Sequence, residues 1–512
     1  MKHQEQQPGT RFAMTRRGFL GGSATVGGLL LASSAGSQPA SQVQPEDWPP
    51  GKPIVVQPIL SYDTPQRGEK TSWRPYGAIH SAELAAAEAR RIEAELKALA
   101  ETSEFPLTPR PVVLAENEAS IDKVIAESDA DVLMPYAAGG AVEWFWKLAN
   151  CGKPNIMFLR HKSGPYYLYH EIVHWRVLRH HEDAMAEPNF DVWDVVVDDY
   201  DELQWRLRAL YGLKNARGTK VLAIGSLTAY SGPAQENGPR VAKDLWGYEI
   251  EVVPREDFAQ RLQRARDNAE FMKSVEDQTD RFLSNPQISL QTERRFVVNS
   301  FAAWKVCRSL LEEKNAFNFG FDRCMNHDVI AMLDTPPCLI LALANDAGYT
   351  AYCHTDLSHT MPGVLLRWIA SRPSFVCNTH FPHHGIYTVA HCAAPMKMDG
   401  HNLEPVTLMT HFESDYGVAS KVEYAKGQIV TLIQPDLHCT RWHGFRGTIV
   451  DTPALPMCRS QMDIAIDGDV KRITERIEGF HAQVVYGDYL REAGYALKKL
   501  GGMEWVNYSE TA

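Results

Sequence analysis

Histidine is concentrated in one part of the sequence, and its chemistry makes that part the first place to expect a functional site. Eight of the 19 histidines lie between residues 354 and 411, and three more follow at His438, His443 and His481. Histidine is the commonest metal ligand in proteins, and it exchanges a proton close to neutral pH. A single histidine is more often a hydrogen-bonded structural residue, but this density favours metal binding or proton transfer.

The segments that carry these histidines sit at the ends of strand-like runs. Cys353 and His354 end an apolar run, His391 follows a short strand, and His481 begins another. None of these segments has the HExxH or CxxC spacing of a strong metal signature. A site built from strand ends that are far apart in the sequence has this pattern, and so does a hydrated surface. The spacing leaves both interpretations open.

At these residues the chain resembles the L-fucose isomerase / L-arabinose isomerase superfamily. The resemblance covers nearly all of the chain after its N-terminal segment, and four stretches match those in which the family carries metal ligands: residues 339–356 (LILALANDAGYTAYCHTD), 372–375, 389–392 and 479–488. It implies an aldose–ketose isomerase and a homo-oligomer. It also implies a divalent cation, usually Mn²⁺, that holds two neighbouring oxygens of a sugar. Carboxylates then move a proton between adjacent carbons.

The sequence departs from the family pattern at the metal ligands. His354 stands where the family has its first carboxylate, and Cys377 or Asn378 stands where it has its second. His391 and His481 are kept. The resemblance therefore implies metal ligands at His354, His391, His481 and Cys377. Imidazole and thiolate are softer ligands than carboxylate, so this set suits Zn²⁺, Cu²⁺ or Fe²⁺ better than Mn²⁺.

Replacement of the metal carboxylates also removes the family's proton carriers. Asp356 and Glu413 are the candidate catalytic replacements. Polar residues that could bind the substrate are predicted from the same region: His380, Lys397, Arg441 and Asp488. For Lys397 and Arg441, a solvated surface charge is the alternative interpretation.

Three functions are compatible with these residues. The first is an exported, metal-dependent enzyme that acts on a sugar or polyol, either an isomerase with altered ligands or a relative with different chemistry. The second is an exported carbohydrate-binding protein that kept the pocket and lost catalysis. The third is a structural or interaction protein whose histidines are core or surface residues.

The N-terminal segment predicts export of the folded chain. Residues 15–20 read Thr-Arg-Arg-Gly-Phe-Leu, and a Gly-rich apolar run continues to about Ala35. A basic pair, a moderate apolar stretch and small residues are typical of a twin-arginine signal peptide. The run is too short for a comfortable membrane span. We expect a signal at 1–35, a disordered linker at 36–50, a periplasmic or secreted product, and no stable membrane span after signal removal.

The remaining chain has the pattern of an α/β protein. Short apolar runs alternate with helical patterns, first at 53–159 and again from residue 192, which predicts parallel sheets covered by helices. The alternation at 406–411 and 428–432 predicts a β-rich end. Together with the resemblance, this gives two Rossmann-like parallel-sheet domains (51–179 and 180–337), followed by a β-rich, barrel-like domain (338–512).

The composition of the chain narrows the classes of molecule that it is expected to bind. The net charge is −11 and the pI is about 6.0, without a basic patch for nucleic acid. The expected partner is a small sugar or polyol. The nine cysteines are odd in number and lack regular spacing, and a chain that folds before export meets an oxidising compartment late. We expect few or no structural disulfides.

Overall fold

The computed structural model describes residues 48–73, 77–167, 169–323 and 327–509. The predicted signal at 1–35 and most of the predicted linker lie outside the described residues. The described end of that linker is packed. The side chain of Trp48 is 5% exposed, and its indole Nε1–H donates to the carbonyl oxygen of Asp346 at 3.1 Å. Trp48, at the end of the predicted linker, therefore belongs to the packed structure.

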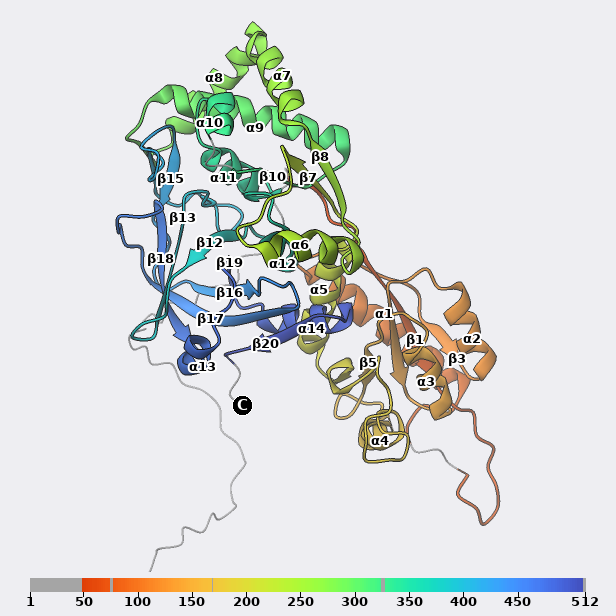
Figure 1. Ribbon diagram of the computed structural model, residues 1–512. Helices are drawn as coiled ribbons and strands as arrows, with labels where there is room; N and C mark the ends of the chain where they lie inside the picture. The colour runs from red at the N-terminus through yellow and green to blue at the C-terminus, as the bar shows by residue number, and fades with distance from the viewer. Residues whose placement is uncertain (1–47, 74–76, 168, 324–326, 510–512) are drawn as a thin grey trace, which may run out of the picture. The chain divides into compact units, whose positions relative to one another are not determined.

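The first sheet is parallel, with strand order β2-β1-β4-β5-β6 and with β3 also paired to β1. Figure 1 shows its strands β1, β3 and β5 together with helices α1, α2 and α3. Every residue of its central strand β4 is buried, as expected for a parallel strand covered on both faces. Helix α1 begins where the Ser81 side chain accepts a hydrogen bond from Leu84 N. The elements are β1 (Ile54–Ser61), α1 (Ala82–Thr102), β2 (Leu107–Pro109), β3 (Val113–Ala115), α2 (Glu118–Glu127), β4 (Val132–Ala137), α3 (Val142–Ala149), β5 (Met157–Leu159), α4 (Tyr169–Arg176), the 3₁₀ helix η1 (Val192–Asp194) and β6 (Val195–Val197).

The second sheet is also parallel, with strand order β11-β10-β7-β8. Helices connect its strands, and helix α9 packs against α8 and α11. The elements between Tyr200 and Ala370 are α5 (Tyr200–Ala216), β7 (Lys220–Ile224), α6 (Gly232–Asp244), β8 (Glu249–Val253), α7 (Arg255–Arg266), α8 (Ala269–Leu283), β9 (Ile288–Leu290), α9 (Arg294–Lys314), β10 (Asn318–Phe321), α10 (His327–Leu333), α11 (Cys338–Asp346), β11 (Thr350–Cys353) and α12 (Leu357–Ala370). Strand β9 lies outside this sheet and pairs with β14 (Val406–Met409), which pairs in turn with β15 (Ala419–Val422).

The C-terminal part contains a closed antiparallel barrel. Its strand order is β16-β19-β12-β13-β18-β17, and β17 pairs back onto β16, while β20 adds to β17 from outside. Closure leaves no free edge among the six barrel strands. The elements are β12 (Phe375–Thr379), β13 (Ile386–His391), β14 (Val406–Met409), β15 (Ala419–Val422), β16 (Ile429–Pro435), β17 (Arg441–Asp451), β18 (Ser460–Asp467), α13 (Val470–Glu475), β19 (His481–Tyr486), α14 (Leu490–Leu500) and β20 (Glu504–Asn507).

The predicted fold class holds at this level: parallel sheets with helices come first, and a β-barrel comes last. The sheets do not follow the predicted boundaries at residues 180 and 338. Strand β6 lies after residue 180 and pairs with β5 in the first sheet. Strand β11 lies after residue 338 and pairs with β10 in the second sheet. The described residues, from Trp48 on, form one compact unit, and the predicted domain limits remain predictions.

Helix α12 is the element that relates the sheets to the barrel. All of its residues, 357–370, are buried. It packs against α5 and α6, and it also packs against the barrel strands β19 and β16. Its N-terminus follows directly on β11, so the carboxyl edge of the second sheet and the outer surface of the barrel meet near residue 357.

No single helix in the described residues has the length and apolar composition to cross a membrane. Helices α10 and α11 meet that criterion only as a pair, bent by 66° at the break between them. Nearly every residue of α11 is buried, and it packs against α9 and β11. Packing inside the protein therefore accounts for the apolar character of α11.

Candidate functional site

The carboxyl ends of β7, β10 and β11 lie at one edge of the second sheet, which is the edge where open parallel sheets usually bind ligands. The loop after β7 is fixed to the segment after β11. Thr355 Oγ1 donates to Ser226 O at 2.6 Å, and Thr228 N donates to Thr355 Oγ1 at 2.8 Å. Ser226 Oγ also donates to Asp322 Oδ2 at 2.8 Å, after β10. This network of hydrogen bonds positions His354, the residue before Thr355.

His354 is paired with a tyrosine from the loop after β7. Its Nε2 lies 2.7 Å from the hydroxyl oxygen of Tyr230, and the two ring centres are 4.4 Å apart. The backbone of His354 has φ of 61°, in the left-handed region that residues with side chains seldom occupy. Such a conformation persists where surrounding contacts impose it, and it is common at functional sites.

The first turn of α12 supplies a second imidazole. Asp356 caps this helix, because its Oδ1 accepts from Ser358 N at 2.9 Å and from Ser358 Oγ at 2.6 Å. His359 Nε2–H donates to Cys353 O at 3.2 Å, so Nδ1 carries the lone pair of the neutral ring. Among the described residues, none forms a hydrogen bond with that buried Nδ1, and the nearest carboxylate oxygen, Asp356 Oδ2, is 3.9 Å away.

Two barrel histidines complete the group. The ring of His481, at the start of β19, lies 4.7 Å from that of His359 and 6.0 Å from that of His391, at the end of β13. No described residue forms a hydrogen bond with the buried Nε2 of His481. His391 Nδ1 accepts from the backbone N–H of Ala393 at 3.0 Å. We call His354, His359, His391 and His481 the imidazole cluster.

Burial keeps the inner imidazoles uncharged. It lowers the pKa of His391 to about 4, and the nearby rings of His359 and His354 act in the same direction. Burial, with the neighbouring imidazoles, also lowers the pKa of His481 well below its ordinary value. The pKa of His359 is lowered mainly by burial, with the Asp356 carboxylate opposing the shift. Neutral imidazoles are the form that binds metal ions or accepts hydrogen bonds from hydroxyl groups.

The donor set can be compared with the cation that the family resemblance implies. It offers orphaned imidazole nitrogens, which suit a borderline cation such as Zn²⁺, Cu²⁺ or Fe²⁺ and not the oxygen-preferring Mn²⁺. Two imidazoles that share a tetrahedral ion have ring centres about 5 Å apart, given Zn–N distances near 2.1 Å. The His359–His481 separation of 4.7 Å fits that spacing. As the side chains lie, no three described His, Cys, Asp or Glu residues are arranged to hold one ion.

The predicted ligand Cys377 lies on the other side of its strand from the cluster. Asn378 is directly opposite His481 in the β12–β19 pair, so these two side chains share a face. Alternation turns the neighbouring Cys377 to the opposite face, where its thiol donates to Ala482 O at 3.5 Å. Of the two alternatives left by the sequence, Asn378 is therefore the residue on the cluster's side.

The two predicted proton carriers differ in their surroundings. Asp356 is next to the cluster, but its carboxylate serves as the cap of α12. Glu413 is exposed in the loop after β14. It lies near the Cys458 thiol, whose pKa is raised mainly by its hydrogen bond with Cys392 and by burial, with Glu413 as a smaller cause. The structure therefore brings one carboxylate to the cluster and leaves the other outside it.

The four predicted substrate-binding residues are spread over the C-terminal part. His380 Nδ1–H donates to Thr388 O at 3.0 Å, two residues beyond the Asn378–His481 pair. Asp488 follows the far end of β19 and accepts from Arg446 at 2.9 Å. The remaining two are engaged elsewhere: Arg441 forms ion pairs with Glu478 and Glu504, and Lys397 lines a cavity beside Trp48 and Asp346.

Two members of the site were not predicted. His359 is one of the eight histidines between residues 354 and 411, but it lies inside an apolar helix pattern and was not selected as a site residue. Tyr230 lies in the polar loop after the buried run 220–224, and a loop at the carboxyl end of a parallel strand could have indicated it. Both come from segments next to residues that were predicted.

A group of thiols adjoins the cluster through His391. Eight cysteines lie among the described residues, and Cys324 lies outside them. Cys392 Sγ accepts from Arg459 N at 3.4 Å. Hydrogen bonds with Cys338 and Cys458 lower the pKa of the Cys392 thiol well below its ordinary value, and His411 adds to this shift. The sequence spacing did not indicate this group, because Cys338, Cys392 and Cys458, with His411, come from four separate segments of the chain.

Comparisons with known proteins do not name a family. The chain matches no protein-family model and none of the curated proteins. Among solved structures, one similar chain is the apo form of the dinucleotide-forming acetyl-coenzyme A synthetase 1 of Ca. Korarchaeum cryptofilum, at 12% sequence identity. The alignment covers 62% of this chain and 66% of that chain, with a TM-score of 0.17. At that score, the likeness carries no argument about fold or function.

Proposed function

We propose that the chain is an exported, carbohydrate-active enzyme whose ligand site is the imidazole cluster. Its reaction is aldose–ketose isomerisation, or a related metal-dependent conversion of a sugar or polyol. The observation that carries the proposal is the pair of buried ring nitrogens, His359 Nδ1 and His481 Nε2, without hydrogen-bond partners among the described residues. An unpaired buried polar atom is costly, so such an atom usually has a partner, which can be a bound water, an ion or a ligand. The resemblance to the L-fucose/L-arabinose isomerase superfamily, with its Rossmann-like sheets, supports the same proposal.

His359 and His481 are the residues that would hold a divalent cation, because each has a buried nitrogen unpaired among the described residues and their rings lie 4.7 Å apart. His391, whose ring lies 6.0 Å from that of His481, would have to turn towards the ion to become a third ligand. When bound, a cation at this site would polarise two neighbouring substrate oxygens as a Lewis acid. The His354–Tyr230 pair would move the proton, because His354 Nε2 lies 2.7 Å from the Tyr230 hydroxyl. This pair would take over the role of the carboxylates that the sequence replaces.

A second candidate is a carbohydrate-binding protein without catalysis. It is favoured by one specific observation: the only predicted proton-carrying carboxylate at the cluster, Asp356, is committed to capping α12. In that case, His359 Nδ1 and His481 Nε2 would accept hydrogen bonds from sugar hydroxyl groups.

Elemental analysis of protein exported by its native host, together with a sugar-turnover assay, tests both candidates. We expect about one borderline metal ion per chain. The double variant H359A/H481A should lose the metal, whereas H383A, which changes an exposed histidine, should keep it. Metal-dependent turnover of pentoses or hexoses supports the enzyme. Saturable sugar binding without metal or turnover supports the second candidate. Absence of metal, turnover and sugar binding would overturn both.

A further inference from the structure

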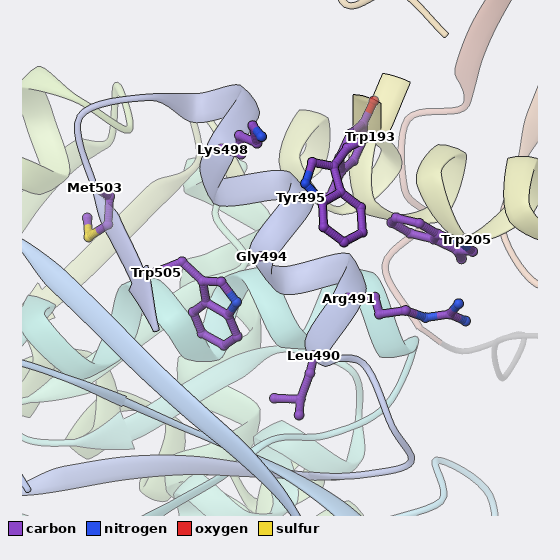
Figure 2. Close-up of a pocket in the computed structure, with 9 residues that line it drawn as sticks. All are labelled: Trp193, Trp205, Leu490, Arg491, Gly494, Tyr495, Lys498, Met503 and Trp505. Carbon is purple, nitrogen blue, oxygen red and sulfur yellow. The ribbon is translucent and has the colours of Figure 1, made fainter. Parts of the chain in front are cut away.

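A groove lined by aromatic side chains lies along α14, and none of its lining residues belongs to the imidazole cluster. Figure 2 shows the ring of Trp505 on one side of Gly494 in this view, with Trp193 and Trp205 on the other. The cavity volume is about 310 Å³. Ligand sites typically measure about 300–1,000 Å³, so the groove has the size of a small ligand.

The aromatic walls are held in fixed positions. Trp505 lies over two glycines, because a Cβ added to Gly494 would come within 2.5 Å of its Nε1 and one added to Gly444 within 2.7 Å of its Cη2. The Trp205 ring packs edge-on against Tyr495 at 5.6 Å, and its Nε1–H donates to Glu202 at 2.9 Å. Rigid walls lose little conformational entropy when a ligand binds.

One wall of the groove is open to solvent. Trp193 is 46% exposed, an unusual position for the side chain with the largest apolar area. Its backbone is fixed, since Arg206 donates to Trp193 O and Asp191 caps the 3₁₀ helix to which Trp193 belongs. An exposed tryptophan on a rigid backbone presents a flat apolar surface to a ligand.

The polar rim of the groove is electrically balanced. Arg491 pairs with Glu202 at 3.2 Å, and Lys498 pairs with Asp191. Because each cation already has a carboxylate, an anionic ligand would meet no net positive charge. Arg491 and Lys498 line the groove and offer N–H donors, while their partner carboxylates Glu202 and Asp191 lie next to the lining residues as acceptors. A hydroxyl group, which both donates and accepts, requires both kinds of partner.

We propose that this aromatic groove binds a neutral carbohydrate ring. The apolar C–H face of the ring would lie on Trp505 and Trp193, and its hydroxyl groups would bond to the Arg491–Glu202 and Lys498–Asp191 pairs. The groove would hold a sugar chain at a place separate from the imidazole cluster. This inference does not require that the cluster be catalytic.

Tryptophan fluorescence and isothermal calorimetry on the full chain test the proposal, with xylohexaose, maltohexaose and cellohexaose as neutral probes. We expect at least one of them to bind at millimolar or better affinity. W193A and G494A should each weaken that binding by about tenfold or more. G494A keeps all the tryptophans, and its added methyl group displaces the ring of Trp505. W193A removes an exposed side chain. Both variants should therefore fold. W175A, at an exposed tryptophan outside the groove, is the matched control.

Each outcome decides the question. Binding that is lost in W193A and G494A, but kept in W175A and in H359A/H481A, supports a groove site independent of the cluster. Failure of all three hexaoses to bind would overturn the proposal. Binding that survives both groove variants would assign the sugar to another site. Binding only of an apolar dye or a hydrophobic peptide would make the groove a protein-docking surface instead.

Discussion

The imidazole rings of His359 and His481 lie 4.7 Å apart, although one belongs to a helix that follows the second sheet and the other to a barrel strand. Each ring has a buried nitrogen that forms no hydrogen bond with any described residue. The pair therefore sits where the two parts of the fold meet, and it is the centre of the proposed site.

The hydroxyl of Tyr230 should matter for turnover more than for stability. Y230F removes the group 2.7 Å from His354 Nε2 and leaves the ring, which is 51% exposed. If this pair moves the substrate proton, kcat should fall by about 10²-fold or more with little change in KM. Steady-state kinetics on the sugar that the protein turns over measures this effect. Y387F, which removes a buried barrel hydroxyl bonded to Gln434, is the control and should reduce stability by about 1 kcal/mol without lowering kcat. An unchanged kcat in Y230F would show that the His354–Tyr230 pair does not move the substrate proton.

Acid should destabilise the protein partly through His443. Burial lowers its pKa to about 4, below the value of 6.5 in an unfolded chain. The unfolded state therefore binds the proton first, so this contribution to stability is complete above pH 6.5 and is lost as the pH falls towards 4. The loss amounts to about 3 kcal/mol. Urea unfolding of H443Q should show a shallower decline between pH 6.5 and 4, and H438Q, at an exposed histidine, should follow the wild type. Parallel curves for H443Q and wild type would contradict this assignment.

Asp346 should have the opposite pH dependence. Burial raises its pKa to about 7, although the N–H groups of Met396 and Lys397 donate to its Oδ1, each at 2.9 Å. Because the pKa of this carboxyl is raised, its contribution to the free energy of unfolding is complete below pH 3.8 and is lost as the pH rises to about 7. D346N keeps the oxygen acceptor and removes the charge. Its unfolding free energy should exceed that of the wild type by about 1–3 kcal/mol at pH 8 and by much less at pH 4. A variant that is less stable at both pH values would contradict the prediction.

Export should depend on the arginine pair near the N-terminus. In R16K/R17K, the predicted twin-arginine signal loses the pair that defines it, so the unprocessed chain should remain inside the cell. Cell fractionation and immunoblotting in the native host would detect the retained chain. R11K, which changes an arginine outside the pair, should be exported normally. Normal export of the double variant would remove the basis for this route.

Much of the architecture could be predicted because buried parallel strands are continuous apolar runs. The run at 220–224 is strand β7, and the run at 131–135 overlaps β4. Sheet membership could not be predicted, since nothing in residues 195–197 indicates that they pair with β5 instead of a later strand. Closure of the barrel also depends on the long-range pairing of β16 with β17 and with β19.

The site could be predicted only in part, for reasons of side-chain direction. His391 ends strand β13 and His481 begins strand β19, and a polar residue at either end of an apolar run is conspicuous. Cys377 was chosen over Asn378 on ligand chemistry, but the choice depends on which face of β12 each occupies, and only the register with His481 decides that. His359 was missed because burial of all of α12 hides it within an apolar segment.

Burial of α12 on every side has a thermodynamic consequence for ligand binding. The helix holds His359 against the sheet edge through Cys353 and against β19 through the bond from Gln483 to His359 O at 2.8 Å. Any opening between the sheet and the barrel would separate His359 from His481 and dismantle the site. The free energy of unfolding therefore rises as ligand fills the site. A ligand at a hundredfold excess over its dissociation constant would raise it by about 2.7 kcal/mol. The melting temperature of this protein is thus a gauge of whatever the imidazoles bind.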